Sequence, residues 1–217
     1  MKILIVSGFL GAGKTTFIKR LARNVDQRFA ILENEYGAAG IDGARLDQNR
    51  QGTQKNVWEM TEQCICCIGK KDFAASVLTI ANVVDPEYLI VEPTGVGSLA
   101  RIIENLRQIE YERIQLLSPV TIVDVYSYRR YMAEYPELYQ DQIRSADTII
   151  VSKTEACQAE EKQRIQKFLQ EINPQAKIIT DYASTMTWED YQSLLLGGRY
   201  EKEVQDTQSG EKMPETF

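Results

Sequence analysis

The residues of this chain best suited to chemistry stand near its N-terminus, in the stretch Gly8-Phe9-Leu10-Gly11-Ala12-Gly13-Lys14-Thr15. Its glycines allow backbone conformations that a Cβ forbids, so that backbone N–H groups can close around phosphate oxygens. Lys14 can reach the β- and γ-phosphates of a nucleotide, and the Thr15 hydroxyl can bind Mg²⁺. An apolar run at residues 3–6 precedes the stretch and a helical pattern at residues 15–24 follows it, a context that favours a P-loop over an ordinary glycine-rich turn. We therefore predict that the following residues bind a nucleotide: Gly8, Gly11, Ala12, Gly13, Lys14, Thr15 and Thr16.

Two carboxylates follow apolar segments farther along the chain. Glu92 directly follows one segment, with Gly95 three residues later, and Glu35 follows another. A carboxylate at a strand end beside a phosphate site can hold Mg²⁺ or orient the attacking water, and a glycine N–H beyond it can sense the γ-phosphate. We predict that Glu92 and Thr15 hold Mg²⁺, that these two and Lys14 are catalytic, and that Gly95 and Glu35 contact the nucleotide. For Glu35, a solvated acidic loop is an equal alternative.

Three of the four cysteines lie within four residues, at Cys64, Cys66 and Cys67. They are too close together for a disulfide framework, and thiolates are soft ligands that suit Zn²⁺ or Cu(I). The chain has no histidine, so carboxylates are the other available metal ligands. We predict a zinc-type site here, whose fourth ligand is left open between water, Glu35, Glu62 and a second protein. The alternative is a group of small, buried, apolar cysteines.

A possible base-recognition motif, Ser152-Lys153-Thr154-Glu155, follows the apolar segment at residues 148–151. In G proteins this place carries Asn-Lys-x-Asp, whose carboxylate accepts two N–H bonds from guanine and whose lysine stem packs on the base. Glu155 keeps the carboxylate with one more methylene, whereas Ser152 loses the amide. We predict that Ser152, Lys153 and Glu155 contact the base, and we leave open both GTP and ATP. An ordinary turn between a strand and a helix is the alternative.

Short apolar segments alternate with helical patterns along the chain, which predicts a mostly parallel sheet with helices on both faces. This is the α/β architecture of P-loop NTPases, in which phosphate sites lie beyond the carboxyl ends of the strands. The predicted strands are residues 3–6, 29–32, 88–91, 120–125, 148–151 and 177–179. The predicted helices are residues 15–24, 70–83, 98–110, 126–131, 136–144, 159–172 and 188–196. Residues 37–56 are predicted to form a long loop.

The length and net charge of the chain limit its domain organisation and the classes of partner that it can bind. A chain of 217 residues suits one large domain, which we expect at residues 1–196, followed by a polar tail at residues 197–217. The net charge of −6 argues against a general nucleic-acid binder. The N-terminal apolar run is too short for a signal peptide or a membrane span, so we expect a cytoplasmic protein that does not bind membranes. The isolated Cys157 is expected to be structural.

Taken together, these motifs resemble the CobW-like metallochaperone GTPases over roughly residues 2–183. The segments that carry the resemblance are residues 8–16, 34–37, 41–42, 64–67, 92–95, 123–124 and 173–174. The resemblance implies a GTPase that couples its nucleotide state to binding of a metal such as zinc or cobalt and delivers that metal to a client metalloprotein. It also allows a homodimer across the nucleotide face.

The sequence departs from this family at three places. Gln63 replaces the usual glycine before the cysteine cluster, Ser-Lys-Thr-Glu replaces Asn-Lys-x-Asp, and the separate C-terminal domain is absent. We therefore expect the chain to correspond to the GTPase domain alone, with a partner that supplies the second domain if metal delivery requires one.

Three functional hypotheses follow. The first is a Mg²⁺-dependent GTP hydrolase that acts as a metallochaperone, with slow turnover because no arginine finger or water-orienting glutamine can be identified. The second is a nucleotide-dependent chaperone that reactivates a metal- or corrinoid-containing enzyme with little hydrolysis of its own. The third is an ATP-using small-molecule kinase, which gives the cysteine cluster no role.

Overall fold

The computed structural model describes residues 1–25, 27–33, 57–61, 70–197 and 200. Its strands are β1 (Lys2–Gly8), β2 (Phe29–Glu33), β3 (Val57–Thr61), β4 (Tyr88–Glu92), β5 (Gln115–Leu116), β6 (Val120–Asp124), β7 (Thr148–Ser152) and β8 (Lys177–Ile179). Its helices are α1 (Lys14–Asn24), α2 (Lys70–Val83), α3 (Leu99–Arg107), α4 (Tyr128–Glu134), α5 (Pro136–Arg144), α6 (Ala159–Ile172), α7 (Tyr182–Thr185) and α8 (Trp188–Leu196).

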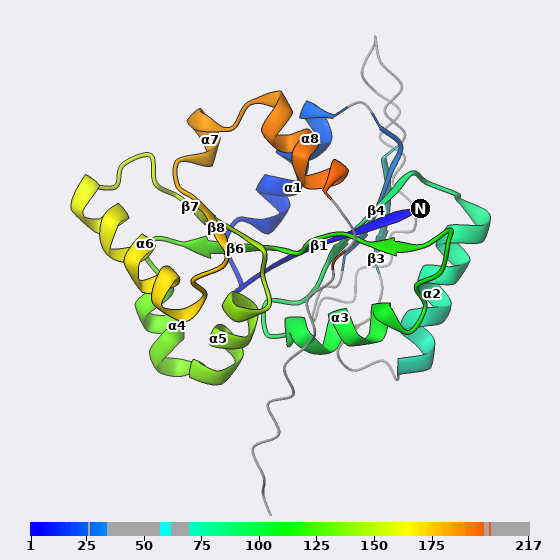
Figure 1. Cartoon of the computed structure of the whole chain (residues 1–217), viewed down its shortest axis with the longest axis horizontal. Helices are drawn as coiled ribbons and strands as arrows, with labels where there is room; N and C mark the ends of the chain where they lie inside the picture. The colour runs from blue at the N-terminus through cyan, green and yellow to red at the C-terminus, as the bar shows by residue number, and fades with distance from the viewer. Residues whose placement is uncertain (26, 34–56, 62–69, 198–199, 201–217) are drawn as a thin grey trace, which may run out of the picture.

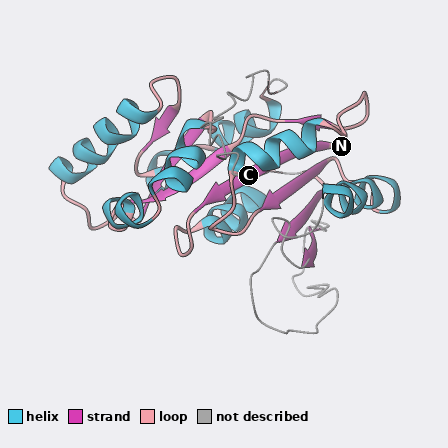
Figure 2. Ribbon diagram, turned by 90° about the horizontal axis from the view of Figure 1, so that it is seen from below, coloured by secondary structure: helices cyan, strands magenta, loops and turns pink. Residues whose placement is uncertain are grey.

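The strands form one sheet in the order β3-β2-β4-β1-β6-β7-β8, and β5 pairs with β1 beside this path. Every neighbouring pair of these strands is parallel. β1 lies between β4 and β6, at the centre of the sheet. Figure 2 shows the strands of the sheet in magenta, with helices in cyan around them. The segments that follow β1, β4, β6 and β7 therefore meet at one edge, where the carboxyl ends of parallel strands collect.

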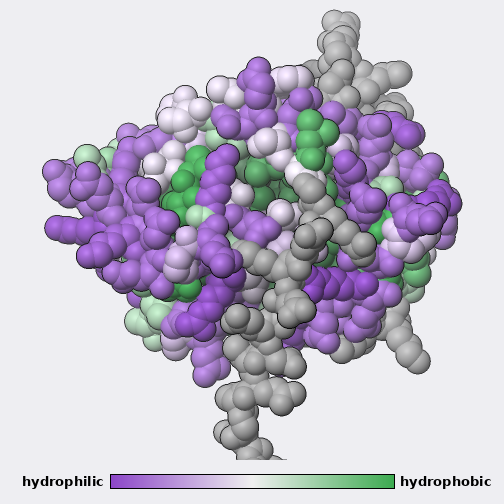
Figure 3. All heavy atoms as spheres, in the orientation of Figure 1, coloured by the Kyte–Doolittle hydropathy of each residue, from purple (hydrophilic) through white to green (hydrophobic). Residues whose placement is uncertain are grey.

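Helices cover both faces of the sheet (Figure 1). Ile3 and Ile5 of β1 pack on one face with residues of α2 and α3, while Leu4 and Val6 pack on the other with α1, α7 and α8. A third cluster joins β6 and β7 to α4, α5 and α6. This alternation along one strand explains why β1 reads as a continuous apolar run, since both of its faces are buried. Hydrophilic residues predominate on the face of the molecule that Figure 3 shows, as expected for the surface around such a core.

The predicted fold class is confirmed, and each predicted strand and helix has a counterpart in the structure. Three elements were missed. β3 follows a polar segment, β5 has only two residues, and α7 is a single turn, so none of them shows a clear apolar period in the sequence. The loop predicted at residues 37–56 lies outside the described residues.

One residue of the predicted tail is part of the core. Tyr200 is 5% exposed, and its N–H donates to the carbonyl oxygen of Leu116 at 2.9 Å. The Arg107 guanidinium carbon lies 5.0 Å from the centre of the Tyr200 ring, and the Tyr200 hydroxyl donates to the Ser145 carbonyl at 3.4 Å. Through Tyr200, the segment after α8 thus contacts β5, α3 and the residue that follows α5.

In the part of the chain that is described, no helix is both long enough and apolar enough to cross a membrane.

Candidate nucleotide site

The P-loop connects the central strand to the first helix. Gly8 is the last residue of β1, and α1 begins at Lys14. Gly13 caps α1 with φ of 99°, a left-handed conformation that strongly favours glycine. Ala12 donates its N–H to the Phe9 carbonyl at 3.1 Å and closes the turn. The first N–H groups of α1 have no acceptor within the helix, so they can bind phosphate oxygens. The three remaining predicted residues of this segment are exposed: Gly11, Thr15 and Thr16.

An aromatic cluster holds the P-loop from the side of α4 and α5. Phe9 is buried, and its ring centre lies 4.6 Å from that of Tyr131 and 5.0 Å from that of Tyr139. The Tyr131 hydroxyl donates to the Leu10 carbonyl at 2.9 Å. Aromatic pairs of this kind stabilise the position of Phe9, and with it the P-loop. The sequence analysis did not identify these aromatic residues, because no local pattern connects residue 9 with residues 131 and 139.

The three predicted catalytic residues meet at the carboxyl ends of β1 and β4. The Thr15 hydroxyl donates to both carboxylate oxygens of Glu92, at 3.1 and 3.2 Å. The Lys14 ammonium lies 4.0 Å from the same carboxylate and donates to the Phe9 carbonyl at 3.4 Å. Burial lowers the pKa of Lys14, and the charge of Glu92 opposes that shift. The site thus combines a desolvated cation with a hydroxyl and a carboxylate.

The oxygens of Thr15 and Glu92 fit a magnesium ion chemically. Mg²⁺ prefers hard oxygen ligands and binds through one or two protein groups together with substrate phosphates. The Thr15 hydroxyl and the Glu92 carboxylate are in direct contact beside the start of α1, where the phosphates of a nucleotide bind in P-loop proteins.

Gly95 is packed directly against the P-loop. A Cβ at this position would stand 2.4 Å from the Leu10 nitrogen and 2.9 Å from the Phe9 carbonyl carbon. Gly97 donates its N–H to the Thr94 carbonyl at 3.0 Å, which closes a tight turn before α3. The segment after β4 therefore lies on the P-loop, as a contact between Gly95 and the γ-phosphate requires.

The predicted base-recognition motif is joined to the P-loop by Ser152. This buried hydroxyl donates to the Ala12 carbonyl at 2.6 Å and has a longer contact of 3.4 Å with the Val123 carbonyl. Lys153 has φ of 60°, a left-handed conformation uncommon outside glycine, and its side chain is half-exposed. Glu155 is exposed on the same turn. Ser152 therefore links the loop after β7 to the phosphate loop.

Asp124, at the end of β6, was not among the predicted site residues. It accepts an ion-paired hydrogen bond from Lys153 at 2.7 Å and further hydrogen bonds from the Tyr126 N–H and the Ser127 hydroxyl. Burial alone would raise the pKa of its carboxyl, but these hydrogen bonds outweigh burial and hold the pKa below its ordinary value. An acidic residue near the carboxyl end of the predicted strand at residues 120–125 is the signal that could have identified it.

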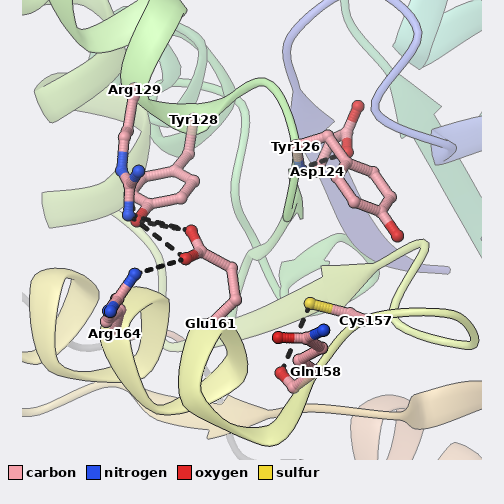
Figure 4. A network of polar contacts seen from close by, with 8 residues as sticks. All are labelled: Asp124, Tyr126, Tyr128, Arg129, Cys157, Gln158, Glu161 and Arg164. Atoms are coloured by element: carbon pink, nitrogen blue, oxygen red, sulfur yellow. Dashed lines mark hydrogen bonds and ion pairs between the residues drawn. The ribbon is translucent and has the colours of Figure 1, made fainter.

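A network of charged side chains holds the start of α6 against α4 (Figure 4). Glu161 accepts from Arg129 at 3.0 Å, from the Tyr128 hydroxyl at 3.2 Å and from Arg164 at 3.4 Å. Cys157, on the turn that leads into α6, is partly buried and forms no disulfide within the described part of the chain. The network fixes the helix that follows the predicted base-recognition motif.

The predicted zinc ligands Cys64, Cys66 and Cys67 lie outside the described residues, as does Glu35. Among the residues that are described, no group of three or more histidine, cysteine, aspartate or glutamate side chains could hold a metal ion.

Together these features define a P-loop NTPase. The central strand of a parallel sheet ends in a glycine loop, the following helix begins with a lysine and a threonine, and the adjacent strand ends in a carboxylate. A family model described as "CobW/HypB/UreG, nucleotide-binding domain" matches residues 2–180. The chain therefore belongs to this family.

Related proteins agree with this assignment. The chain is 30% identical over 178 residues to the zinc chaperone YeiR of Escherichia coli K12, covering 81% of this chain and 53% of YeiR. It is 28% identical over 194 residues to the zinc chaperone CobW of Pseudomonas aeruginosa, covering 76% of this chain and 52% of that protein. The chain thus spans about half the length of these relatives.

Solved structures share the fold. Zn(II)-bound YjiA GTPase from E. coli superimposes with a TM-score of 0.67 at 20% identity, covering 100% of this chain and 67% of YjiA. The hydrogenase maturation factor HypB from Archaeoglobus fulgidus superimposes with a TM-score of 0.57 at 18% identity, covering 90% of this chain and 89% of HypB.

Proposed function

We propose that this protein is a Mg²⁺-dependent GTP-binding and hydrolysing protein that couples its nucleotide state to the binding of zinc, or another soft divalent metal, and to its delivery to a client metalloprotein. The observation that carries the proposal is the contact between Lys14, Thr15 and Glu92 at the start of α1. ATP is an alternative nucleotide, because the base-recognition motif departs from Asn-Lys-x-Asp.

The phosphates of the nucleotide bind to the N–H groups of the P-loop and the start of α1. The Lys14 ammonium, already desolvated, stabilises the charge that develops on the γ-phosphoryl oxygens during attack by water. Mg²⁺, when bound by Thr15 and Glu92, supplies further positive charge at the phosphate oxygens. Turnover is slow, because none of the described residues has been identified as a group that orients the attacking water.

The loop after β7 binds the base. Glu155 accepts hydrogen bonds from the base, Lys153 packs along its face, and Ser152 connects this loop to the P-loop through the Ala12 carbonyl. Glu35 contributes to the nucleotide site from the segment after β2.

Zinc is bound by Cys64, Cys66 and Cys67, whose thiolates are suited to it. The zinc chaperones among the relatives support this part of the proposal. We further propose that residues 1–196 form the GTPase domain and residues 197–217 a tail. We also propose that the protein acts in the cytoplasm, that it can form a homodimer across the nucleotide face, and that it binds neither nucleic acid nor membranes.

Hydrolysis of GTP and of ATP, measured with and without Mg²⁺, tests the nucleotide part. We expect Lys14→Ala to lower kcat/KM for GTP by about a hundredfold or more, because it removes a charge that stabilises the transition state. Lys19→Ala is the matched control, since Lys19 is an exposed lysine on the same helix. Wild-type hydrolysis by Lys14→Ala contradicts the assignment, and phosphoryl transfer from ATP to a metabolite supports a kinase instead.

The metal part is tested by replacing Cys64, Cys66 and Cys67 with serine together. We expect zinc stoichiometry to fall while GTP affinity is unchanged, and Cys157→Ser to alter neither. Unchanged zinc stoichiometry in the triple variant refutes the cysteine site. Stimulation of hydrolysis only by a client enzyme, and not by zinc, favours the reactivating chaperone.

A further inference from the structure

Gln142 of α5 holds the turn that follows β4. Its side chain is 1% exposed, and Nε2 donates to the Gly95 carbonyl at 3.2 Å and to the Gly97 carbonyl at 2.9 Å. Its other polar atom, Oε1, is buried and has no hydrogen-bond partner among the described residues. An unpaired buried oxygen costs stability that an apolar side chain of the same size avoids. The amide therefore serves the turn rather than the general stability of the core.

The neighbouring residue, Asp141, holds the other end of the same segment. Its Oδ2 accepts the N–H of Leu99 at 2.7 Å and that of Ala100 at 3.4 Å. These N–H groups belong to the first turn of α3 and lack acceptors within that helix. A negative charge at this end of a helix is also stabilised by the helix dipole. Asp141 thus fixes the start of α3 relative to α5, which packs beside it (Figure 1).

α5 is itself anchored to the residue that follows α6. Asn173, the residue after α6, donates from Nδ2 to the carbonyls of Ile143 and Ala146, each at 2.8 Å. These bonds satisfy carbonyls that the end of a helix leaves without partners. α5 is therefore a fixed support on which the segment after β4 rests.

On its opposite side the same segment touches the P-loop. The position of a Cβ on Gly95 would be 2.4 Å from the Leu10 nitrogen. The segment is held between the P-loop and α5, so a shift of Gly95 away from the P-loop disturbs its hydrogen bond with Gln142.

We infer that Gln142 and Asp141 are positioning residues for nucleotide hydrolysis, which hold residues 94–100 against the P-loop with Gly95 at the γ-phosphate. This inference rests on the proposed function. Neither residue touches the nucleotide. Both act through the segment, so their loss weakens recognition of the γ-phosphate more than recognition of the rest of the nucleotide.

The test compares the affinities for GDP and for the non-hydrolysable triphosphate GMPPNP, measured by calorimetry with Mg²⁺, together with kcat and KM for GTP. In Gln142→Met we expect the preference for GMPPNP over GDP to fall by about tenfold, the factor that one net hydrogen bond provides. We expect kcat for GTP to fall and KM to rise by a similar factor of about ten, because KM follows the affinity for the triphosphate when turnover is slow. Thr121→Val is the matched control. It removes the buried hydrogen bond of 2.9 Å from the Thr121 hydroxyl to the backbone carbonyl of Gln142, and it leaves the bonds between the Gln142 side chain and the segment after β4 in place.

Thr121→Val should lower the melting temperature as Gln142→Met does, yet keep the wild-type preference. If Gln142→Met does not fold, the same measurement of GMPPNP and GDP affinity on Asp141→Ala tests the inference, because the Asp141 side chain is partly exposed. The inference is overturned if folded Gln142→Met and Asp141→Ala keep the wild-type preference for GMPPNP over GDP. It is also overturned if Thr121→Val loses as much of this preference as they do. A wild-type protein that binds GDP and GMPPNP equally also overturns it. Absence of hydrolysis in the wild type refutes the proposed enzyme activity, while the binding preference still tests the positioning role.

Discussion

Replacement of Gly95 by alanine is the smallest change that should separate the segment after β4 from the P-loop. The backbone at this position is not in the left-handed region, so alanine is compatible with the local conformation. The cost arises from a collision. The new Cβ would stand 2.4 Å from the Leu10 nitrogen, 2.9 Å from the Phe9 carbonyl carbon and 3.0 Å from the Leu10 Cα.

The size of the effect follows from these distances. Ordinary van der Waals contact begins at 3.4 Å, so the gap between the two segments must open by 1.0 Å to relieve the contact at 2.4 Å. The atoms on the far side belong to backbone and cannot rotate away. A misplacement of this size near a reacting group can lower the rate by about a hundredfold. We therefore expect Gly95→Ala to lower kcat for GTP by about that factor.

Steady-state hydrolysis of GTP, with the melting temperature measured in parallel, checks this expectation. Gly197→Ala is the matched control, because its Cβ would stand 3.3 Å from the Ser193 carbonyl oxygen and 3.9 Å from that of Leu194, both on α8. We expect that variant to hydrolyse GTP at the wild-type rate. A Gly95→Ala variant that is folded and has the wild-type kcat would refute the reasoning that this contact sets the geometry of the site.

Three further changes test other parts of the site. Glu92→Gln removes a metal-binding charge, so the Mg²⁺ concentration for half-maximal hydrolysis should rise at least about tenfold; an unchanged Mg²⁺ titration contradicts the assignment. Ser152→Ala removes the hydrogen bond to Ala12 and should lower the free energy of unfolding by about 1 kcal/mol, measured by urea denaturation, and weaken nucleotide binding; wild-type values in both measurements exclude the link. The pKa of Asp124 is lower in the folded state than in the unfolded state, where it is about 4. The ionised carboxylate therefore stabilises the folded protein above pH about 4, and this stabilisation is lost as the pH falls through the folded-state pKa. Asp124→Asn should therefore flatten the dependence of unfolding free energy on pH below about 5, and an identical pH dependence would show that Asp124 is not the group responsible.

The sequence alone determined the fold class and predicted a phosphate site, because both follow from short-range patterns. Residues 8–15 form a P-loop through local backbone geometry, and the apolar segments on either side of it predict a strand and a helix. Glu92 could be assigned from its place at a strand end, since parallel strands bring their carboxyl ends to one edge of the sheet. The structure confirms that Lys14, Thr15 and Glu92 meet there.

Only the tertiary structure decided which distant residues hold this site in place. Gln142 lies 47 positions from Gly95, and Ser152 lies 140 positions from Ala12, yet each pair is joined by a hydrogen bond. Asp124 becomes the partner of Lys153 because β6 and β7 are adjacent in the sheet. No local period or propensity records such contacts, since they arise from the order of the strands and the packing of helices on them. The sequence therefore specified the groups that we predict to bind phosphate, and the packed fold specified the supports that position them.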